Sequence, residues 1–225
     1  MALEPAFILM MAVSVVIGYL LGSINFGVVV SKGLYHEDVR TKGSGNAGTT
    51  NILRTYGKKA AALTLAGDMA KGAVAVWLCH WGVAALTGAD LNGVYAGYLA
   101  AIGAVCGHLW PVWFGFKGGK GIAVAAGAIL ASEPVVLLAL LVVFFAIALT
   151  TRIVSLASVT VAVLYPILTL LWSWYTQRSL LFTGVCTVLM AVLVVWMHRA
   201  NIQRLMNGTE SVSYTHLTLP TIRLV

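Results

Sequence analysis

The sequence predicts an all-α integral membrane protein, a compact bundle of about seven transmembrane helices, two of them short, with the N-terminus outside and the C-terminus cytoplasmic. Hydrophobic residues make up 60% of the 225 residues and charged residues only 9%, and the mean hydropathy is +0.93. Soluble globular chains carry about 25% charged residues. This chain therefore cannot cover a water-soluble surface, and its composition also excludes disordered, collagenous, coiled-coil and disulfide-rich secreted classes.

Segments long enough to cross a bilayer follow one another along the chain, since a spanning helix needs about 20 apolar residues. The first covers about residues 6–30 and is preceded only by Glu4, so we expect a retained helix rather than a cleaved signal peptide. We expect one membrane-embedded domain over residues 1–210, followed by an atypical tail, 211–225, whose removal leaves activity unchanged. The other apolar segments cover roughly residues 60–86, 93–114, 121–150, 153–176 and 180–198.

The basic residues predict the topology, because Lys and Arg gather in loops that face the cytoplasm. The turn at residues 87–92 has no Lys or Arg and is expected outside, whereas Lys117 and Lys120 place the next loop inside. The net charge of +7 is explained by these loops, and no folded basic domain of the kind that binds nucleic acid is apparent. The polar stretch that follows the first apolar segment is expected inside because it holds Lys32, Arg40, Lys42, Arg54, Lys58 and Lys59.

Glu133-Pro134 interrupts the long apolar segment at residues 121–150. An unbroken helix there would place Arg152 and the basic C-terminal region outside. The residue before a proline disfavours the helical conformation. We therefore expect two short helices that turn back, which brings the count to seven and returns the C-terminus to the cytoplasm.

A glycine-rich loop with hydroxyl and amide side chains lies at residues 43–51, before a short amphipathic run that carries Arg54. Glycine permits positive φ angles that turn successive backbone N–H groups toward one point, and a helix beginning near Thr50 would add its positive dipole end. The spacing fits G-x-G-x-x-G, but the preceding element is a membrane helix and not a β-strand, which excludes a dinucleotide fold. We expect phosphate binding here; the alternative is an ordinary flexible loop.

A second loop, Gly118-Gly119-Lys120-Gly121, precedes an apolar helix. Backbone donors and a lysine at a helix N-terminus again favour an anion, although Ile122 stands where a Walker A motif needs Ser or Thr. The alternative is a membrane-edge turn with lysines that reach toward the interface. We expect His108, which precedes this loop, to be a hydrogen-bonded structural residue.

A third polar segment follows the last apolar span at residues 198–205. On a helix His198 and Asn201 share a face, and an imidazole beside a carboxamide suits a phosphate or hydroxyl ligand. A basic anchor at the cytoplasmic surface is the alternative. Within the second apolar span, Asp68 and Lys71 are expected to pair, because isolated charges are costly in a membrane. Such charges favour a functional role, and a neutralised structural pair is the alternative.

Five strings in this order resemble the bacterial acyl-phosphate:glycerol-3-phosphate acyltransferase family (PlsY). The resemblance spans about residues 6–210. It implies a seven-helix enzyme of the bacterial inner membrane, with its active site facing the cytoplasm, that moves a fatty acyl group from acyl phosphate to the 1-hydroxyl of glycerol 3-phosphate. The strings are GSINFG (22–27), GSGNAGTTNILRTYGKKA (43–60), GDMAKG (67–72), GHLWPVWFGFKGGKG (107–121) and HRANIQRL (198–205).

The resemblance also implies the residues of the site and the partners. The implied partners are glycerol 3-phosphate, acyl phosphate, membrane lipid and the enzyme that forms acyl phosphate; neither nucleic acid, a cofactor nor a metal is expected. The implied catalytic residues are Ser44, Arg54, Lys120, His198 and Asn201. The implied substrate-binding residues are Gly43, Gly45, Asn46, Gly48, Thr49, Thr50, Asn51, Gly118, Gly119 and Gly121.

Three further observations bear on the donor, the family pattern and the alternative function. None of the five histidines begins the His-x-x-x-x-Asp motif of the commoner glycerolipid acyltransferases, so acyl-CoA and acyl carrier protein are poor candidates as direct donors. The chain departs from the family pattern at Asn25 and Ala47, where proline is usual, and at Ala200, where an acidic residue is common. The alternative function is a transporter or binding protein for a phosphorylated metabolite, which would need anion sites near the midplane and inverted repeats.

Overall fold

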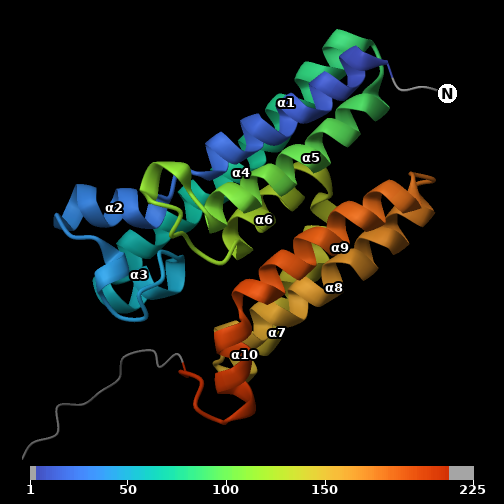
Figure 1. Cartoon of the computed structure of the whole chain (residues 1–225). Coiled ribbons are helices and arrows are strands. Elements are labelled where there is room, and N and C mark those ends of the chain that lie inside the picture. Colours follow the sequence, from blue (N-terminus) through green and yellow to red (C-terminus); the bar gives the residue numbers. More distant parts are fainter. Residues whose placement is uncertain (1–3, 213–225) are drawn as a thin grey trace, which may run out of the picture.

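The computed structural model describes residues 4–212, and within that range every regular element is helical (Figure 1). Six helical stretches in this range are long and apolar enough to cross a membrane. The elements are α1 (Pro5–Gly22), α2 (Phe26–Tyr35), η1 (Val39–Thr41), α3 (Thr49–Tyr56), α4 (Lys58–Thr87), α5 (Asp90–Leu109), η2 (Val112–Phe114), α6 (Ile122–Ser132), α7 (Pro134–Thr151), α8 (Val154–Tyr175), α9 (Leu180–Met197) and α10 (Arg199–Met206).

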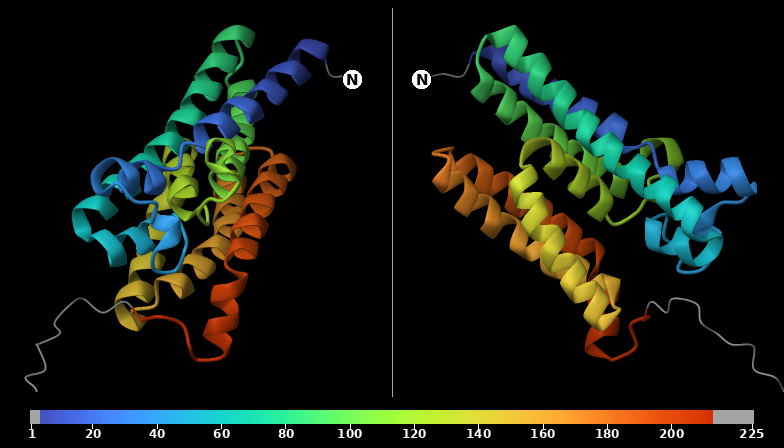
Figure 2. Two further views of the ribbon diagram at one scale, coloured as in Figure 1. Left: turned by 60° about the vertical axis from the view of Figure 1, so that its left-hand side comes forward. Right: turned by 180° about the vertical axis from the view of Figure 1, so that it is seen from behind.

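The long helices form two groups that lie side by side (Figures 1 and 2). Helices α1, α4 and α5 pack against one another, and α6 packs on α4 and α5. Helices α7, α8 and α9 form the second group, which meets the first where α5 contacts α9 and α6 continues into α7. The short helices α2, α3 and α10 lie at the end of the bundle away from the N-terminus (Figure 1).

The break at Glu133-Pro134 is present as the sequence predicts. Glu133 ends α6 with a non-helical backbone, and Pro134 occupies the first turn of α7, where its missing N–H costs no hydrogen bond. The expectation of two short helices is wrong for α7: α6 has 11 residues, but α7 has 18. Helix α7 reaches this length because it continues to Thr151, and only Arg152 and Ile153 separate it from α8. The count of seven spans and the orientation of the termini stay predictions.

The first apolar segment is also broken, which the sequence analysis does not anticipate. Helix α1 ends at Gly22, and α2 continues to Tyr35 rather than ending near Val30. The buried side chain of Asn25 caps α2, because its Oδ1 accepts a hydrogen bond from the Val28 backbone N–H at 3.2 Å. Asn25 stands where the family usually has proline, and here it begins the helix through its side chain.

Close contact between α1 and α5 depends on glycines that face the partner backbone. A Cβ at Gly103 would overlap backbone atoms of Val15 and Tyr19, and one at Gly22 would overlap the backbone of Ala104. Glycines four residues apart on a membrane helix let a neighbouring helix approach closely, so that van der Waals packing and weak polar contacts hold the two helices together. The same relation holds for Gly18 on α1 and Gly107 on α5.

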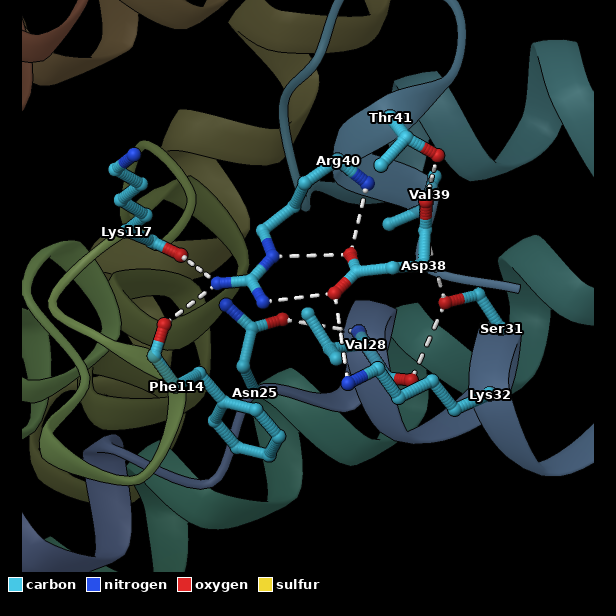
Figure 3. Close-up of polar contacts among 10 residues, drawn as sticks. All are labelled: Asn25, Val28, Ser31, Lys32, Asp38, Val39, Arg40, Thr41, Phe114 and Lys117. Atoms are coloured by element: carbon cyan, nitrogen blue, oxygen red, sulfur yellow. Dashed lines mark hydrogen bonds and ion pairs between the residues drawn. The ribbon is translucent and has the colours of Figure 1, made fainter. Parts of the chain in front are cut away.

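An arginine, Arg40, forms an ion pair within the segment after α2 and hydrogen-bonds that segment to the loop after α5 (Figure 3). Arg40 donates to the Asp38 carboxylate through Nε at 2.9 Å and through Nη2 at 2.7 Å. Its Nη1 donates to the carbonyl oxygens of Phe114 at 2.6 Å and Lys117 at 3.0 Å. Hydrogen bonds from Arg40 hold the pKa of Asp38 at about 2, so the pair is charged at neutral pH. We call this group the Asp38–Arg40 link.

Replacement of Gly103 by valine tests the contact between α1 and α5. The added side chain must push the α1 backbone away, so we expect the melting temperature in detergent to fall by about 5 °C or more. Gly82 is the matched control, since a Cβ there meets no atom within 4 Å. Equal melting temperatures for Gly103→Val and Gly82→Val would contradict this account.

Replacement of Arg40 by alanine tests the Asp38–Arg40 link. We expect the melting temperature in detergent to fall by about 4 °C or more, because the two loops lose charge-assisted hydrogen bonds that fix their relative position. Lys32→Ala is the control: Lys32 also faces Asp38, at 3.6 Å, but is 56% exposed, and such pairs contribute little. Thermal unfolding of the purified variants measures this, and equal melting temperatures for Arg40→Ala and Lys32→Ala would refute it.

Candidate active site

A cavity of about 830 Å³ lies between the two helix groups, and it has a polar end and an apolar end. Residues of α3, α6 and α10, of the segments that flank them, one polar residue each from α4 and α5, and two from α8 line the polar end. Helices α4 and α6–α9 supply the apolar wall. The polar lining comprises Ser44, Gly45, Asn46, Thr49, Thr50, Asn51, Arg54, Asp68, His108, Lys120, Gly121, Ser155, Ser158, His198, Asn201, Arg204, Glu210 and Ser211.

The first glycine-rich loop adopts the expected backbone in part. Gly43 and Gly45 have φ angles of 55° and 70°, which glycine adopts without steric cost. Gly48 is extended and is the N-cap of α3, so the helix starts at Thr49, one residue before the predicted position. Neither Gly43 nor Gly48 lines the cavity. The N-terminus of α3 does reach it, and partial positive charge there favours an anion.

Thr49, the first residue of α3, has a hydroxyl group that is free to bind a ligand. Its hydroxyl oxygen is buried and has no hydrogen-bond partner in the part of the chain that the structure describes. Buried polar groups in proteins nearly always have a partner. Because Thr49 and Thr50 both line the cavity at the start of α3, the free hydroxyl fits a site that a ligand completes.

Asn51 organises the loop with its amide. Its Nδ2 donates to the carbonyl oxygens of Lys42 at 3.1 Å and Asn46 at 2.9 Å, and its Oδ1 accepts from the Ser44 backbone N–H at 3.0 Å. The residue is buried. Asn51 also lines the cavity, so substrate binding by this residue stays a prediction beside its role in shaping the loop. A Cβ at Gly43 would collide with Oδ1 of Asn51.

The second loop contributes fewer free backbone donors than expected. The N–H groups of Gly118 and Gly119 donate to the carbonyl oxygens of Leu109 at 3.2 Å and His108 at 3.1 Å. Neither glycine lines the cavity, so we assign both to closing the loop rather than to a ligand. Gly119 lies against the His108 imidazole, which leaves no room for a Cβ.

Lys120 and Gly121 do reach the cavity, at the N-terminus of α6. Gly121 has a φ angle of 90° and is the N-cap of the helix. Burial lowers the pKa of Lys120, and the nearby Arg204 and Arg54 lower it further. The second loop therefore presents a cation and a helix N-terminus together.

A chain of hydrogen bonds connects Lys120 to α10. Lys120 donates to Oδ1 of Asn201, and Nδ2 of Asn201 donates to Glu210 at 2.7 Å. Arg204 donates to the other oxygen of Glu210 at 2.7 Å, and the hydroxyl of Ser155 on α8 donates at 2.7 Å. These bonds lower the pKa of Glu210 against the effect of burial. The carboxylate thus fixes both Asn201 and Arg204.

Sequence reasoning missed Glu210 and Arg204 as members of the site. Ala200 stands where an acidic residue is common next to the asparagine, and Glu210 supplies a carboxylate to Asn201 from nine residues further along. The signal available in the sequence was the lone acidic residue after a run that contains two arginines. Ser211 also lines the cavity, so the segment predicted to be dispensable begins at the site; residues 213–225 lie outside the described range.

His198 is buried where α9 meets α10 and lines the cavity. Its Nδ1 lies 2.8 Å from the Val194 carbonyl oxygen. Because a carbonyl only accepts, Nδ1 carries the proton and Nε2 is left as the acceptor. Burial lowers the pKa of His198 to about 4, so the ring is neutral at pH 7. As predicted, His198 and Asn201 come together at the same end of the cavity.

Asp68, Lys71 and His108 form a buried polar cluster beneath the second loop. Lys71 lies 2.7 Å from the Asp68 carboxylate and 2.9 Å from Nδ1 of His108, and it donates to the Ile24 carbonyl oxygen at 2.7 Å. The predicted pairing of Asp68 with Lys71 and the structural role of His108 are both present. The cluster connects α4, α5 and the break between α1 and α2.

The apolar part of the cavity could hold a hydrocarbon chain. It extends from the polar end along α6, α7, α8 and α9, between the two helix groups. Its lining includes Leu65, Met69, Ile122, Ala123, Ala125, Ala126, Ile129, Leu137, Leu140, Leu141, Phe144, Phe145, Val161, Ala162, Tyr165, Met190, Ala191, Val194 and Met197. An anion site and an apolar slot thus belong to one cavity, which suits an amphiphilic ligand.

Comparison with known proteins places the chain in a family. The family model for glycerol-3-phosphate acyltransferase matches residues 12–208. The glycerol-3-phosphate acyltransferase of Clostridioides difficile (strain 630) is 44% identical over 195 residues, 87% of this chain and 91% of that protein. That of Bordetella pertussis (strain Tohama I) is 42% identical over 211 residues, 94% of this chain and 95% of that protein.

Solved structures agree with these relatives. The fold is similar to a crystal structure of PlsY (YgiH), an integral membrane glycerol 3-phosphate acyltransferase, in its glycerol 3-phosphate form, with a TM-score of 0.77 and 35% identity over 91% of this chain and 96% of that chain. For the lysophosphatidic acid form the TM-score is 0.75 and the identity 33%, over the same shares. The chain therefore belongs to the glycerol-3-phosphate acyltransferase family of integral membrane enzymes.

Proposed function

We propose that the enzyme transfers a fatty acyl group from acyl phosphate to the 1-hydroxyl of sn-glycerol 3-phosphate. The products are 1-acyl-sn-glycerol 3-phosphate and inorganic phosphate, and the reaction is the first step of phospholipid synthesis. The observation that carries this proposal is the single cavity that joins a cationic polar end to an apolar slot. Similar structures bind glycerol 3-phosphate and lysophosphatidic acid, which match the proposed acceptor and product.

Two phosphate-bearing reactants repel each other, so the polar end must offset their charge. Arg54, Lys120 and Arg204 line it together with the N-termini of α3 and α6. Cations and helix N-termini stabilise phosphate groups in this way. The chain's own contribution to rate is then to hold the hydroxyl of one reactant against the carbonyl of the other and to stabilise charge on the departing phosphate.

Acyl phosphate is a mixed anhydride with a good leaving group, so the reaction needs no enzyme nucleophile. The acceptor hydroxyl oxygen forms the new ester bond to the carbonyl carbon as the carbon–oxygen bond to phosphate breaks. The released phosphate carries the bonding electrons. None of the cysteines lines the cavity, which Cys79, Cys106 and Cys186 would have to do to act as nucleophiles. Ser44 lies in the polar lining, and we assign it to binding the reacting end of the donor.

We assign removal of the hydroxyl proton to a phosphate oxygen of a substrate. His198 is the protein group that could compete for the proton, since Nε2 is unprotonated. A pKa of about 4 makes it a weak base at neutral pH, however, and an efficient general base has a pKa near the working pH. His198 is better suited to accept a hydrogen bond from a substrate hydroxyl.

We further propose that the polar end of the cavity faces the cytoplasm at the bacterial inner membrane, and the distribution of basic residues supports this. Lys and Arg concentrate around α2, α3 and the second loop, and the turn between α4 and α5 has none. The acceptor and the released phosphate are water-soluble and would exchange with the cytoplasm, while the acylated product would leave into the inner leaflet.

Phosphate release by purified protein in detergent tests the reaction. We expect release to require both acyl phosphate and glycerol 3-phosphate, and Lys120→Ala to lower kcat/KM by at least about a hundredfold, as loss of one transition-state donor does. Lys117→Ala is the control in the same loop, because its exposed side chain lies outside the cavity lining. Phosphate release that does not need glycerol 3-phosphate, or acyl transfer to glycerol 3-phosphate from acyl-CoA as the only donor, would overturn the assignment.

Replacement of His198 by alanine tests the assignment of the proton. We expect a higher KM for glycerol 3-phosphate with kcat reduced less than about tenfold, and recovery of KM in His198→Gln, whose amide can replace the hydrogen bonds. A general base contributes about 10²–10⁴-fold. The assignment fails if kcat falls by that factor while binding of glycerol 3-phosphate, measured by calorimetry, is intact.

A further inference from the structure

The apolar end of the cavity closes at a defined depth. On α8 its wall runs from Val154 to Tyr165, about 16 Å along the helix. On the other helices the deepest lining residues are Ile129, Leu137 and Met190, and all of these are at least 95% buried. The deep end of the slot is therefore formed by side chains buried inside the protein.

A polar cluster lies directly beyond this end. Glu133, at the break between α6 and α7, is one helical turn past Ile129 and one turn before Leu137. It is completely buried. Its carboxyl group accepts hydrogen bonds from the hydroxyl of Tyr98 on α5 at 2.6 Å and from the hydroxyl of Thr169 on α8 at 2.8 Å.

This cluster opposes extension of a hydrocarbon chain past Tyr165. Room for another methylene would require Glu133 to separate from Tyr98 or Thr169. A hydrocarbon offers no replacement hydrogen bond, and a buried polar group left without a partner is unfavourable. The hydrogen bonds also connect α5, the α6–α7 break and α8, so movement of any one of these three side chains breaks at least one of them.

We propose that Glu133, with Tyr98 and Thr169, forms the closed end of the acyl-chain site and sets the longest chain that the enzyme uses efficiently. This inference rests on the proposed function, in which the acyl chain of the donor occupies the apolar slot. Glu133 acts on chain length through the space that it fills, and it does not touch the reacting atoms.

Chain-length profiles test the proposal. The full-length enzyme in lipid nanodiscs is given glycerol 3-phosphate and saturated acyl phosphates in steps of two carbons, and kcat/KM is measured for each. Glu133→Ala removes the carboxyl group and opens the end of the slot. Each buried methylene improves binding about fourfold, so we expect kcat/KM for the chain two carbons beyond the wild-type limit to rise about tenfold, with short chains unaffected.

Glu133→Gln is the matched control for size and hydrogen bonding, and it should keep the wild-type profile. A second pair makes the opposite change. Leu137→Phe fills the closed end and should lower kcat/KM about tenfold for the longest accepted chain only. Leu138→Phe is its neighbour control, because Leu138 is 65% exposed. If Glu133→Ala does not give monodisperse protein, the test rests on comparing the chain-length profiles of Leu137→Phe and Leu138→Phe.

The outcomes separate the two proposals. Longer chains accepted by Glu133→Ala, or shorter ones preferred by Leu137→Phe, support the closed end at Glu133. Wild-type turnover with acyl phosphates but unchanged profiles in both variants refutes the closed end and leaves the proposed function standing. No turnover by wild-type enzyme with any acyl phosphate refutes the proposed function itself.

Discussion

Hydrogen bonds from side chains to loops and helix ends hold the polar end of the cavity together. Three segments meet there, and each of them lies outside the long helices. Asn51 bonds three backbone groups of its own loop, Arg40 connects that region to the carbonyls of the second loop, and Glu210 connects α10 to α8. Each bond involves an amide or a charged group, for which loss of the partner is costly. The placement of Lys120 and His198 depends on this framework.

Much of the fold could be predicted because it follows from local rules. Apolar length identifies the spans, and the break at Glu133 follows from the residue before a proline being disfavoured in the helical conformation. The pairing of Asp68 with Lys71 follows from their spacing on one helix and the cost of lone charges in lipid. The glycine pattern at Gly43 and Gly45 predicts left-handed backbone, which is present. These features need no knowledge of distant segments.

Other features could not be predicted because they depend on contacts between segments far apart in the chain. The N–H groups of Gly118 and Gly119 are used by carbonyls at the end of α5, so the same sequence pattern that binds anions elsewhere here closes a loop. Glu210 reaches the site only because the segment after α10 folds back toward α8. Asn25 differs from the proline that is usual at this position in the family, but its side chain forms the N-cap of α2. Spacing along the chain does not encode such partners.

The place of Ser211 in the cavity wall has a practical consequence. An affinity tag or fluorophore joined closely after Val212 would be tethered beside the entrance for water-soluble ligands and could compete with them. The turn at Gly88, between α4 and α5, lies at the opposite end of the bundle (Figure 1). Labels for imaging or immobilisation are therefore better inserted at that turn, where they leave the entrance unobstructed.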